Sequence, residues 1–143
     1  MTIRPATPAD VAKLADLTTQ LGYPTSPEEA EERLRDLASR REDAVLVAEA
    51  DGEVAGWIHV AALRSLEMDP CAMIQGLVVD ESRRGGGIGA ALVEAAAGWA
   101  AGYGFRTLRV RSNSVRERTH AFYERLGFAR TKSQVVLARP VGD

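Results

Sequence analysis

The chain has 143 residues, a length that suits one compact domain with a proper hydrophobic core. Hydrophobic residues make up 45% and charged residues 27% of the chain, as in ordinary soluble globular proteins. The formal net charge is −2, whereas non-specific nucleic-acid binding usually needs a strongly basic surface. We therefore expect no nucleic-acid partner.

Cys71 is the single cysteine, so an intrachain disulfide is excluded, and the sequence has no Cys/His cluster that would predict a metal site. The N-terminus has no apolar segment of the kind that marks a signal peptide. The longest stretch of small apolar residues, 90–101, is interrupted by Glu94 and is too short to span a bilayer. We expect a single cytoplasmic domain over residues 1–143, without metal and without a membrane partner.

Hydrophobic periodicity and turn residues predict an alternation of helices and strands. Apolar residues recur at helical spacing after Thr7 and Pro8, a typical helix start, and Ser26 with Glu29 forms a capping box for a second helix. The resulting class is α/β (α+β), with a mixed central sheet of six to seven strands flanked by about four helices. The expected strands lie at 3–6, 44–48, 54–61, 73–79, 107–111, 128–132 and 135–139, and the expected helices at 7–21, 26–37, 88–99 and 115–126.

A glycine-rich turn between an apolar strand and a helix is the most informative segment. Four glycines fall within residues 85–89. Glycine permits otherwise strained backbone conformations and a close approach of ligand to backbone, and the free N–H groups at a helix start attract anions. Arg83 and Arg84 add positive charge nearby. The segment therefore predicts a ligand that carries phosphate.

Two other phosphate-binding patterns fit this turn less well. A Walker A loop would end in Gly-Lys-Ser or Gly-Lys-Thr, which the chain lacks. Gly85, Gly87 and Ala90 do match the dinucleotide pattern G-x-G-x-x-A, but residues 108–111 lack the acidic residue that would bind a ribose. The chain is also too short for a full doubly wound fold. A nicotinamide-nucleotide-binding protein stays as an alternative.

Two segments instead resemble those of the GNAT superfamily of N-acetyltransferases. Residues 84–89, Arg-Gly-Gly-Gly-Ile-Gly, match the R/Q-x-x-G-x-G/A signature, which in that family holds the pyrophosphate of acetyl-CoA. Residues 121–128, Ala-Phe-Tyr-Glu-Arg-Leu-Gly-Phe, resemble the family's F-Y-x-x-x-G-F element near the thioester sulfur. The spacing of the two segments and the order of elements agree, so the resemblance covers nearly the whole chain.

The resemblance implies an acetyl-CoA-dependent N-acetyltransferase that acts on a primary amine. The strands at 73–79 and 107–112 would splay apart and hold the pantetheine arm, with a backbone N–H near Val78 stabilising the developing oxyanion. Tyr123 stands at the family's general-acid position. The residues expected to bind acetyl-CoA are Leu77, Val78, Val79, Arg84, Gly85, Gly86, Gly87, Ile88, Gly89, Ala90, Asn113 and Arg116.

The chain departs from the family pattern at two positions. Many relatives carry a glutamate as general base where this chain has Gln75, which cannot accept a proton. Relatives often carry asparagine where this chain has Arg116, so Asn113 is a candidate for its contacts and Arg116 for a cofactor phosphate. We expect the amine to lose its proton to water. The other candidate bases are His59, Glu67, Asp69 and His120.

The acceptor amine is left open by the sequence. In the family it is selected by the connection between the first two helices and by loops near the final strands, here residues 21–26 and 67–72. Polyamines, aminoglycosides, amino acids and protein N-termini all stay open, as do longer acyl groups and a homodimer. Because Gln75 replaces the usual base, a non-catalytic acyl-CoA-binding module is a second alternative.

Overall fold

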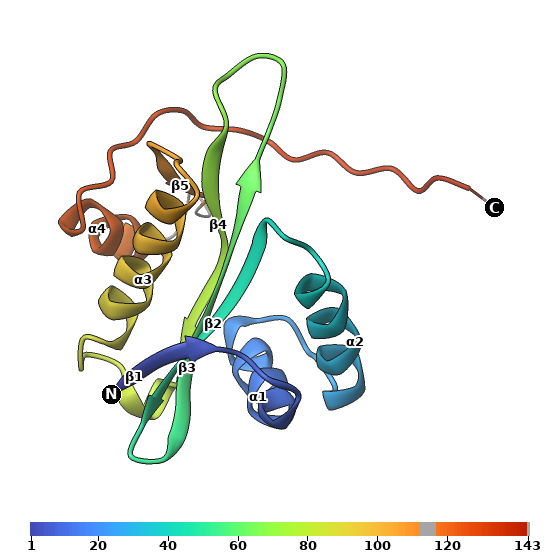
Figure 1. The fold of residues 1–143 in the computed structure, drawn as a ribbon, viewed down its shortest axis with the longest axis vertical. Coiled ribbons are helices and arrows are strands. Elements are labelled where there is room, and N and C mark those ends of the chain that lie inside the picture. Colours follow the sequence, from blue (N-terminus) through green and yellow to red (C-terminus); the bar gives the residue numbers. More distant parts are fainter. Residues whose placement is uncertain (112–116, 143) are drawn as a thin grey trace. The chain divides into compact units, whose positions relative to one another are not determined.

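The computed structural model describes residues 1–111 and 117–142. The chain divides into two compact units, Met1–Arg111 and Ser112–Asp143, and each is described by itself. The first unit contains the sheet and the helices that cover it (Figure 1). No helix among the described residues is both long enough and apolar enough to cross a membrane.

The first unit opens with strand β1 (Thr2–Pro5), a 3-10 turn η1 (Pro8–Asp10) and two helices, α1 (Val11–Leu21) and α2 (Pro27–Ala38). The capping box predicted for α2 is formed. Ser26 Oγ accepts a hydrogen bond from the Glu29 N–H at 3.1 Å, and Glu29 Oε1 accepts one from the Ser26 N–H at 3.0 Å. Helix α1 ends at Gly22, whose φ of 115° is left-handed, as is common at helix ends.

The sheet has the order β1-β2-β3-β4-β5. Strands β2 (Asp43–Ala50), β3 (Glu53–Leu63) and β4 (Cys71–Val79) form an antiparallel meander with β1. Strand β5 (Leu108–Val110) pairs with β4 in parallel, after helix α3 (Ile88–Gly102) has crossed between them. The described part of the chain therefore has the mixed sheet and the four helices that the sequence predicts.

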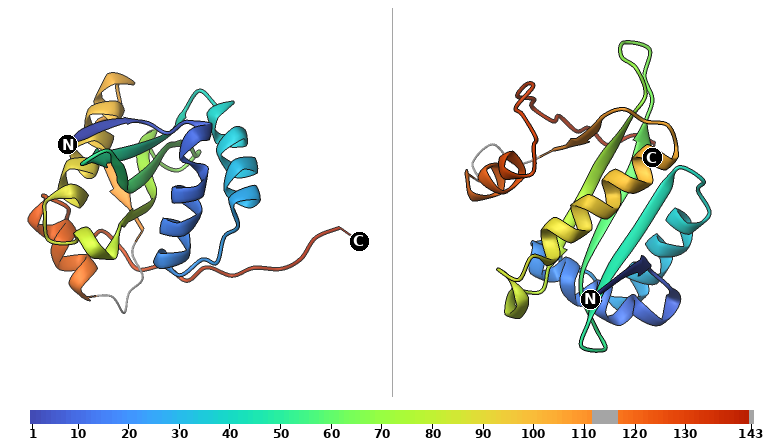
Figure 2. Two further views of the ribbon diagram at one scale, coloured as in Figure 1. Left: turned by 90° about the horizontal axis from the view of Figure 1, so that it is seen from below. Right: turned by 60° about the vertical axis from the view of Figure 1, so that its left-hand side comes forward.

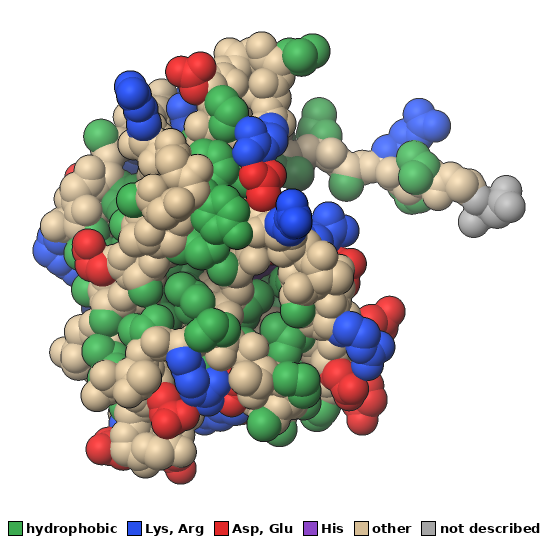
Figure 3. All heavy atoms as spheres, viewed as in Figure 1, with side chains coloured by type: hydrophobic (Ala, Val, Ile, Leu, Met, Phe, Trp, Pro, Cys, Tyr) green, Lys and Arg blue, Asp and Glu red, His purple; other side chains and the backbone are tan. Residues whose placement is uncertain are grey.

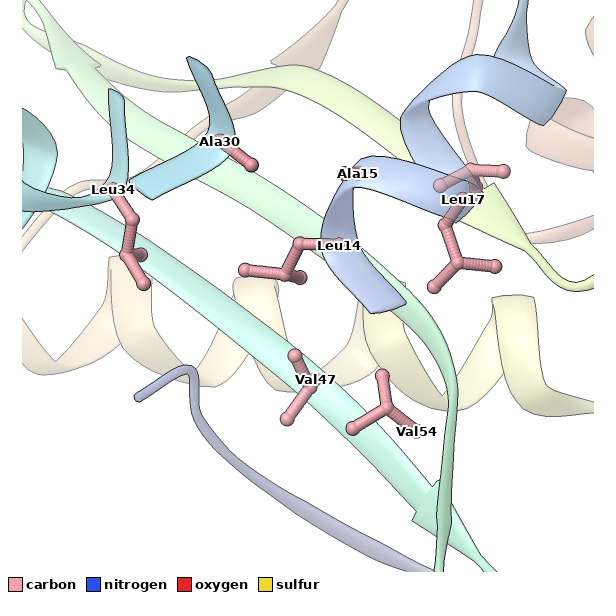
Figure 4. Close-up of a cluster of buried hydrophobic side chains, with 8 residues drawn as sticks. Leu14, Ala15, Leu17, Ala30, Leu34, Val47 and Val54 are labelled. Atoms are coloured by element: carbon pink, nitrogen blue, oxygen red, sulfur yellow. The ribbon is translucent and has the colours of Figure 1, made fainter. Parts of the chain in front are cut away.

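Helices α1 and α2 cover one face of this sheet and α3 covers the other (Figure 2). Leu14 and Leu17 of α1 and Leu34 of α2 pack against Val47 and Val54 of the sheet, and all five side chains are buried (Figure 4). Full burial of a side chain of this kind contributes about 1.5–3 kcal/mol. The solvent side of α2 carries charges of both signs (Figure 3), with ion pairs four residues apart such as Arg35–Glu31 at 3.1 Å.

The prediction of six to seven strands is not confirmed, because the described residues form a five-stranded sheet. The second unit contains helix α4 (Glu117–Arg125), and residues 128–142 after it are assigned neither helix nor strand. Residues 128–132 and 135–139 have the side-chain pattern of strands, but a strand also needs a partner for its backbone hydrogen bonds. Val135, Val136 and Leu137 are exposed.

Candidate active site

The glycine-rich turn leads from β4 through a 3-10 turn, η2 (Glu81–Arg83), into α3. Gly85 and Gly87 have φ values of 87° and 83°, a left-handed conformation that favours glycine. The first hydrogen bond of α3 runs from the Ala91 N–H to the Gly87 carbonyl at 3.0 Å. The N–H groups of residues 88–90 therefore have no acceptor within the helix and are available to an anion.

The space around this turn suits a ligand that approaches the backbone. A Cβ atom built on Gly85 or Gly87 would meet nothing within 4 Å. The glycines are thus required by their backbone conformation and not by packing against the rest of the described chain. An oxygen of a phosphate group can reach the helix start from this open side.

Asp80, at the end of β4, fixes the beginning of the turn. Its carboxylate accepts hydrogen bonds from the Ser82 N–H at 3.0 Å and the Ser82 hydroxyl at 2.9 Å, and Lys13 Nζ of α1 lies 2.6 Å away. The Lys13 ammonium holds the pKa of this carboxyl well below its usual range. Asp80 is not among the residues expected from the sequence, although Asp-x-Ser is a recognisable turn pattern in which the carboxylate binds the backbone two residues on.

The two arginines of the turn have different roles. Arg83 lies 3.0 Å from an Asp51 carboxylate oxygen and 3.6 Å from Glu53, so it ties the turn to the β2–β3 hairpin. Arg84 donates from Nε to the Val79 carbonyl at 3.4 Å and is exposed. Arg84 is therefore the better placed of the two to meet an incoming phosphate.

Among the described residues, strand β4 is paired with β5 over only part of its length. Its pairing with β5 covers only the three pairs from Ala72–Leu108 to Ile74–Val110, whereas β4 continues to Val79. Among the described residues, the backbone from residue 75 to residue 79 is therefore paired with β3 alone. The family resemblance implies that the two strands diverge here. Residues 112–116, which follow β5 in the sequence, lie outside the described residues, so the divergence stays a prediction.

The register shows which backbone groups of β4 face β3 and which face away from it. The Asp80 N–H donates to the Ala55 carbonyl of β3 at 2.7 Å. Backbone groups alternate in direction along a strand. The N–H and C=O groups of Val78 therefore also face β3, whereas those of Leu77 and Val79 face away from it. The N–H of Val78 is directed at Trp57, its partner in β3. The N–H groups near Val78 that face away from β3 are thus those of Leu77 and Val79.

A β-bulge at Gln75 produces this register. His59 of β3 pairs with Gly76, but the next residue, Val60, pairs with Ile74, so Gln75 has no direct partner on β3. A bulge of one residue reverses the direction of the backbone groups that follow it. Gln75 is exposed, at the point where β5 ends its pairing with β4.

The other candidate bases lie in different settings. Glu67 and Asp69 are exposed in the connection between β3 and β4. His59 is half-buried, and its Nε2 lies 2.7 Å from Asp43 Oδ1 on β2. Cys71 is a buried free thiol at the start of β4.

Tyr123 lies on α4 in the second unit and is buried. Its ring packs edge-on against Phe122 and Phe128, with centroid distances of 5.0 and 5.4 Å. Burial raises the pKa of Tyr123 to about 12, so its hydroxyl stays protonated at neutral pH. His120 on the same helix lies 3.3 Å from Arg130. Asn113 and Arg116 lie outside the described residues.

The family model for the GNAT acetyltransferases matches residues 11–128, more than half of the chain. The chain therefore belongs to the GNAT acetyltransferase family and is an acetyltransferase. Members of this family use acetyl-CoA, which agrees with the phosphate-bearing ligand expected at the start of α3. This agreement favours acetyl-CoA over the nicotinamide nucleotide considered for the G-x-G-x-x-A pattern.

Similar proteins are found among both sequences and solved structures. An aminoglycoside N(6′)-acetyltransferase type 1 from Stenotrophomonas maltophilia is 32% identical over 144 residues, which covers 98% of this chain and 94% of that protein. The crystal structure of the aminoglycoside antibiotic 6′-N-acetyltransferase AAC(6′)-IG from Acinetobacter haemolyticus has a TM-score of 0.85 at 20% identity, with coverage of 99% and 100%. The aminoglycoside N-acetyltransferase AAC(6′)-Iy, solved with CoA, has a TM-score of 0.82 at 19% identity, with coverage of 98% and 100%.

Proposed function

We propose that this chain transfers the acetyl group of acetyl-CoA to a primary amine of an aminoglycoside. The observation that carries the proposal is the start of α3, where two left-handed glycines have open space beside them and the first N–H groups have no acceptor within the helix. It follows a strand whose last residues pair only with β3 among the described residues. The aminoglycoside class is supported by the relative from Stenotrophomonas maltophilia, whose match extends over nearly all of both chains.

In this proposal the donor is held by backbone groups. The N–H groups of Ile88, Gly89 and Ala90 bind the pyrophosphate, with the exposed Arg84 as the nearby cation. The backbone of Leu77 and Val79 pairs with the amides of the pantetheine arm, as a strand of the sheet would. Asn113 and Arg116 complete the donor site in this proposal, as the sequence suggests.

The acetyl transfer itself needs three tasks from the protein. A backbone N–H stabilises the negative charge that develops on the thioester oxygen. We assign this task to the Leu77 N–H, which faces away from β3 near the Gln75 bulge. The amine must also lose a proton, and the departing thiolate must be stabilised. We assign the last task to the Tyr123 hydroxyl.

The raised pKa of Tyr123 defines what this hydroxyl can do. A phenol with a pKa of about 12 transfers its proton to a thiolate, whose conjugate acid has a pKa near 8.5, only with a free-energy cost. A hydrogen bond from the neutral hydroxyl to the developing thiolate carries no such cost. We therefore propose that Tyr123 acts mainly as a hydrogen-bond donor whose proton moves late in the step.

A matched pair of aminoglycosides tests the proposal. One compound carries an amine at its 6′ position and the other carries a hydroxyl there, while the rest of the two molecules is the same. We expect acetyl-CoA-dependent thiol release with the 6′-amine compound and little release with its 6′-hydroxyl counterpart. Equal release with both would move the acetylated amine to another position, and no release with either would remove aminoglycosides as the acceptor class.

A further inference from the structure

The pair formed by His59 and Asp43 is a feature that the donor site does not use. His59 Nε2 lies 2.7 Å from Asp43 Oδ1, and the two side chains are 18% and 17% exposed. We propose that His59, oriented by Asp43, is the base that accepts the proton of the acceptor amine. This inference rests on the acetyl-transfer function proposed above.

The register of the sheet places the backbone of His59 beside the Gln75 bulge. His59 pairs directly with Gly76, and the Cα atoms of such a hydrogen-bonded antiparallel pair lie about 5.5 Å apart. A Cβ atom on Gly76 would lie 2.9 Å from the Trp57 ring. The half-buried indole of Trp57 therefore covers Gly76 on this face and lies next to His59.

The face of the sheet on which His59 lies also fits the role. Trp57 and His59 are two residues apart in β3 and therefore share a face. Trp57 packs against the cluster of α1 and α2, whereas α3, whose start holds the proposed phosphate site, covers the opposite face. A base on the α1–α2 face can thus meet the amine on the side of β4 that α3 and the glycine-rich turn do not occupy.

Asp43 determines which ring nitrogen can take a proton. A carboxylate accepts a hydrogen bond, so the contact at Nε2 favours the tautomer with its hydrogen on Nε2. The lone pair then lies on Nδ1. In the proposed step an ammonium N–H bond breaks and an Nδ1–H bond forms. The neutral amine then forms its C–N bond to the thioester carbon while the C–S bond breaks. The attacking nitrogen loses a second proton to give the neutral amide, and this proton balances the one that the departing thiolate takes up beside the Tyr123 hydroxyl.

Asp43 is the charged side chain that the described contacts place against the imidazole. Asp43 faces it from β2, while its neighbours on β4, Gly76 and Met73, carry no charge. Glu42 and Arg64, which flank the same ends of β2 and β3, form a hydrogen bond of 3.0 Å with each other. Met73 is buried and uncharged, so Asp43 is the charged partner that orients the imidazole.

A purely structural role is the competing explanation, because the same contact ties β2 to β3. The two roles differ in their readouts. A structural tie affects the melting temperature and leaves the pH dependence to the substrate amine. A base produces a limb in the pH profile of kcat/KM that belongs to the enzyme.

The experiment measures kcat/KM against pH for wild type with two accepted amines whose pKa values differ by about one unit. If His59 is the base, the acidic limb stays at the same pH for both amines. A limb that moves with the pKa of the amine overturns the inference, and this comparison needs no variant. Absence of acetyl transfer in wild type with any amine would instead overturn the proposed function.

Variants then show which group produces the acidic limb of the kcat/KM profile. His59→Gln is expected to lower kcat/KM by about 10²–10⁴-fold, the usual range for general base catalysis, and to abolish the fixed limb while acetyl-CoA affinity stays near wild type. Asp43→Asn should lower kcat/KM less. Arg64→Gln is the matched control, since it breaks a neighbouring contact between the same strand ends and should leave the profile unchanged. A folded His59→Gln protein with wild-type kcat/KM and limb would contradict the inference.

Discussion

Lys13 Nζ lies 2.6 Å from Asp80 Oδ2, across 67 positions of sequence. This contact joins helix α1 to the residue at which β4 ends and the glycine-rich turn begins. The same carboxylate also accepts two hydrogen bonds from Ser82. The conformation of the phosphate-binding turn is therefore coupled to the packing of α1 on the sheet.

Asp80→Asn should destabilise the fold and weaken acetyl-CoA binding together. Loss of charged hydrogen bonds by a buried group costs about 1–3 kcal/mol, which thermal unfolding and a titration with acetyl-CoA would detect. Asp16→Asn is the control, because Asp16 is the exposed second partner of Lys13 at 3.4 Å, and we expect a change within about 0.5 kcal/mol. Equal effects of the two substitutions would contradict the role given to Asp80.

The Lys13–Asp80 pair also predicts a pH dependence of stability. Lys13 lowers the pKa of the Asp80 carboxyl in the folded state, so the unfolded state binds the proton first as the pH falls. The contribution of the pair to the free energy of unfolding is complete above the ordinary carboxyl pKa of about 3.9. It is lost as the pH falls through the lowered pKa of Asp80. The acid-induced loss of stability should therefore be smaller in Asp80→Asn than in wild type, as urea unfolding at a series of acidic pH values would show.

Gly87→Val should abolish acetyl-CoA binding without unfolding the chain. A β-branched residue is strained at the φ of 83° that Gly87 adopts, and its side chain would fill the open space beside the free N–H groups of α3. Gly98→Ala is the control, since Gly98 lies in the middle of the same helix and an added Cβ atom there would meet nothing within 4 Å. Circular dichroism checks the fold, and wild-type affinity in folded Gly87→Val would refute the phosphate site.

Packing between α3 and the sheet gives a prediction about stability. A Cβ atom on Gly56 would lie 2.7 Å from the Val78 carbonyl oxygen and 3.2 Å from a Leu92 methyl group. Backbone cannot move aside as a side chain can, so Gly56→Ala should cost about 1–3 kcal/mol in the free energy of unfolding. Gly98→Ala should instead stabilise the protein by roughly 0.4–1 kcal/mol. An unchanged free energy of unfolding for Gly56→Ala in urea would show that the sheet and α3 are less closely packed.

Tyr123→Phe should lower kcat by about 10–10⁴-fold with little change in acetyl-CoA affinity. Because burial raises the pKa of Tyr123 to about 12, its hydroxyl keeps its proton at all ordinary assay pH values. Its ionisation should therefore produce no fall in rate below about pH 11. Tyr103→Phe is a matched control, as its hydroxyl bonds only to the Arg41 carbonyl at 2.7 Å among the described contacts. Equal kcat values for the two variants would remove Tyr123 from the mechanism.

The helices and the strands of the meander could be predicted from sequence because their signals are local. The capping box at Ser26, the turn at residues 51–52 and the apolar run of β4 each specify an element within a few residues. The strands expected at 128–132 and 135–139 depend on a partner elsewhere in the chain, and a side-chain pattern cannot supply that information.

In the candidate site, too, the features with local sequence signals could be predicted and those that depend on distant residues could not. The glycine pattern at 85–89 predicts both the left-handed residues and the helix start, which the structure contains. The bulge at Gln75 and the contacts of Asp80 and His59 could not be predicted, because each depends on the register of strands or on residues far apart in sequence. Bulges carry no sequence signature strong enough to be recognised in a single chain.

The most direct test of the account is whether acetyl-CoA and an amine are converted together. Purified wild type and Gly87→Val would be incubated with acetyl-CoA and a panel of primary amines that includes a 6′-amino aminoglycoside, and thiol release and the acetylated product would be quantified in the same sample. We predict equal amounts of free CoA and acetylated amine with wild type, and neither above background with Gly87→Val. Thiol release without an acetylated amine, or undiminished transfer by folded Gly87→Val, would contradict the account.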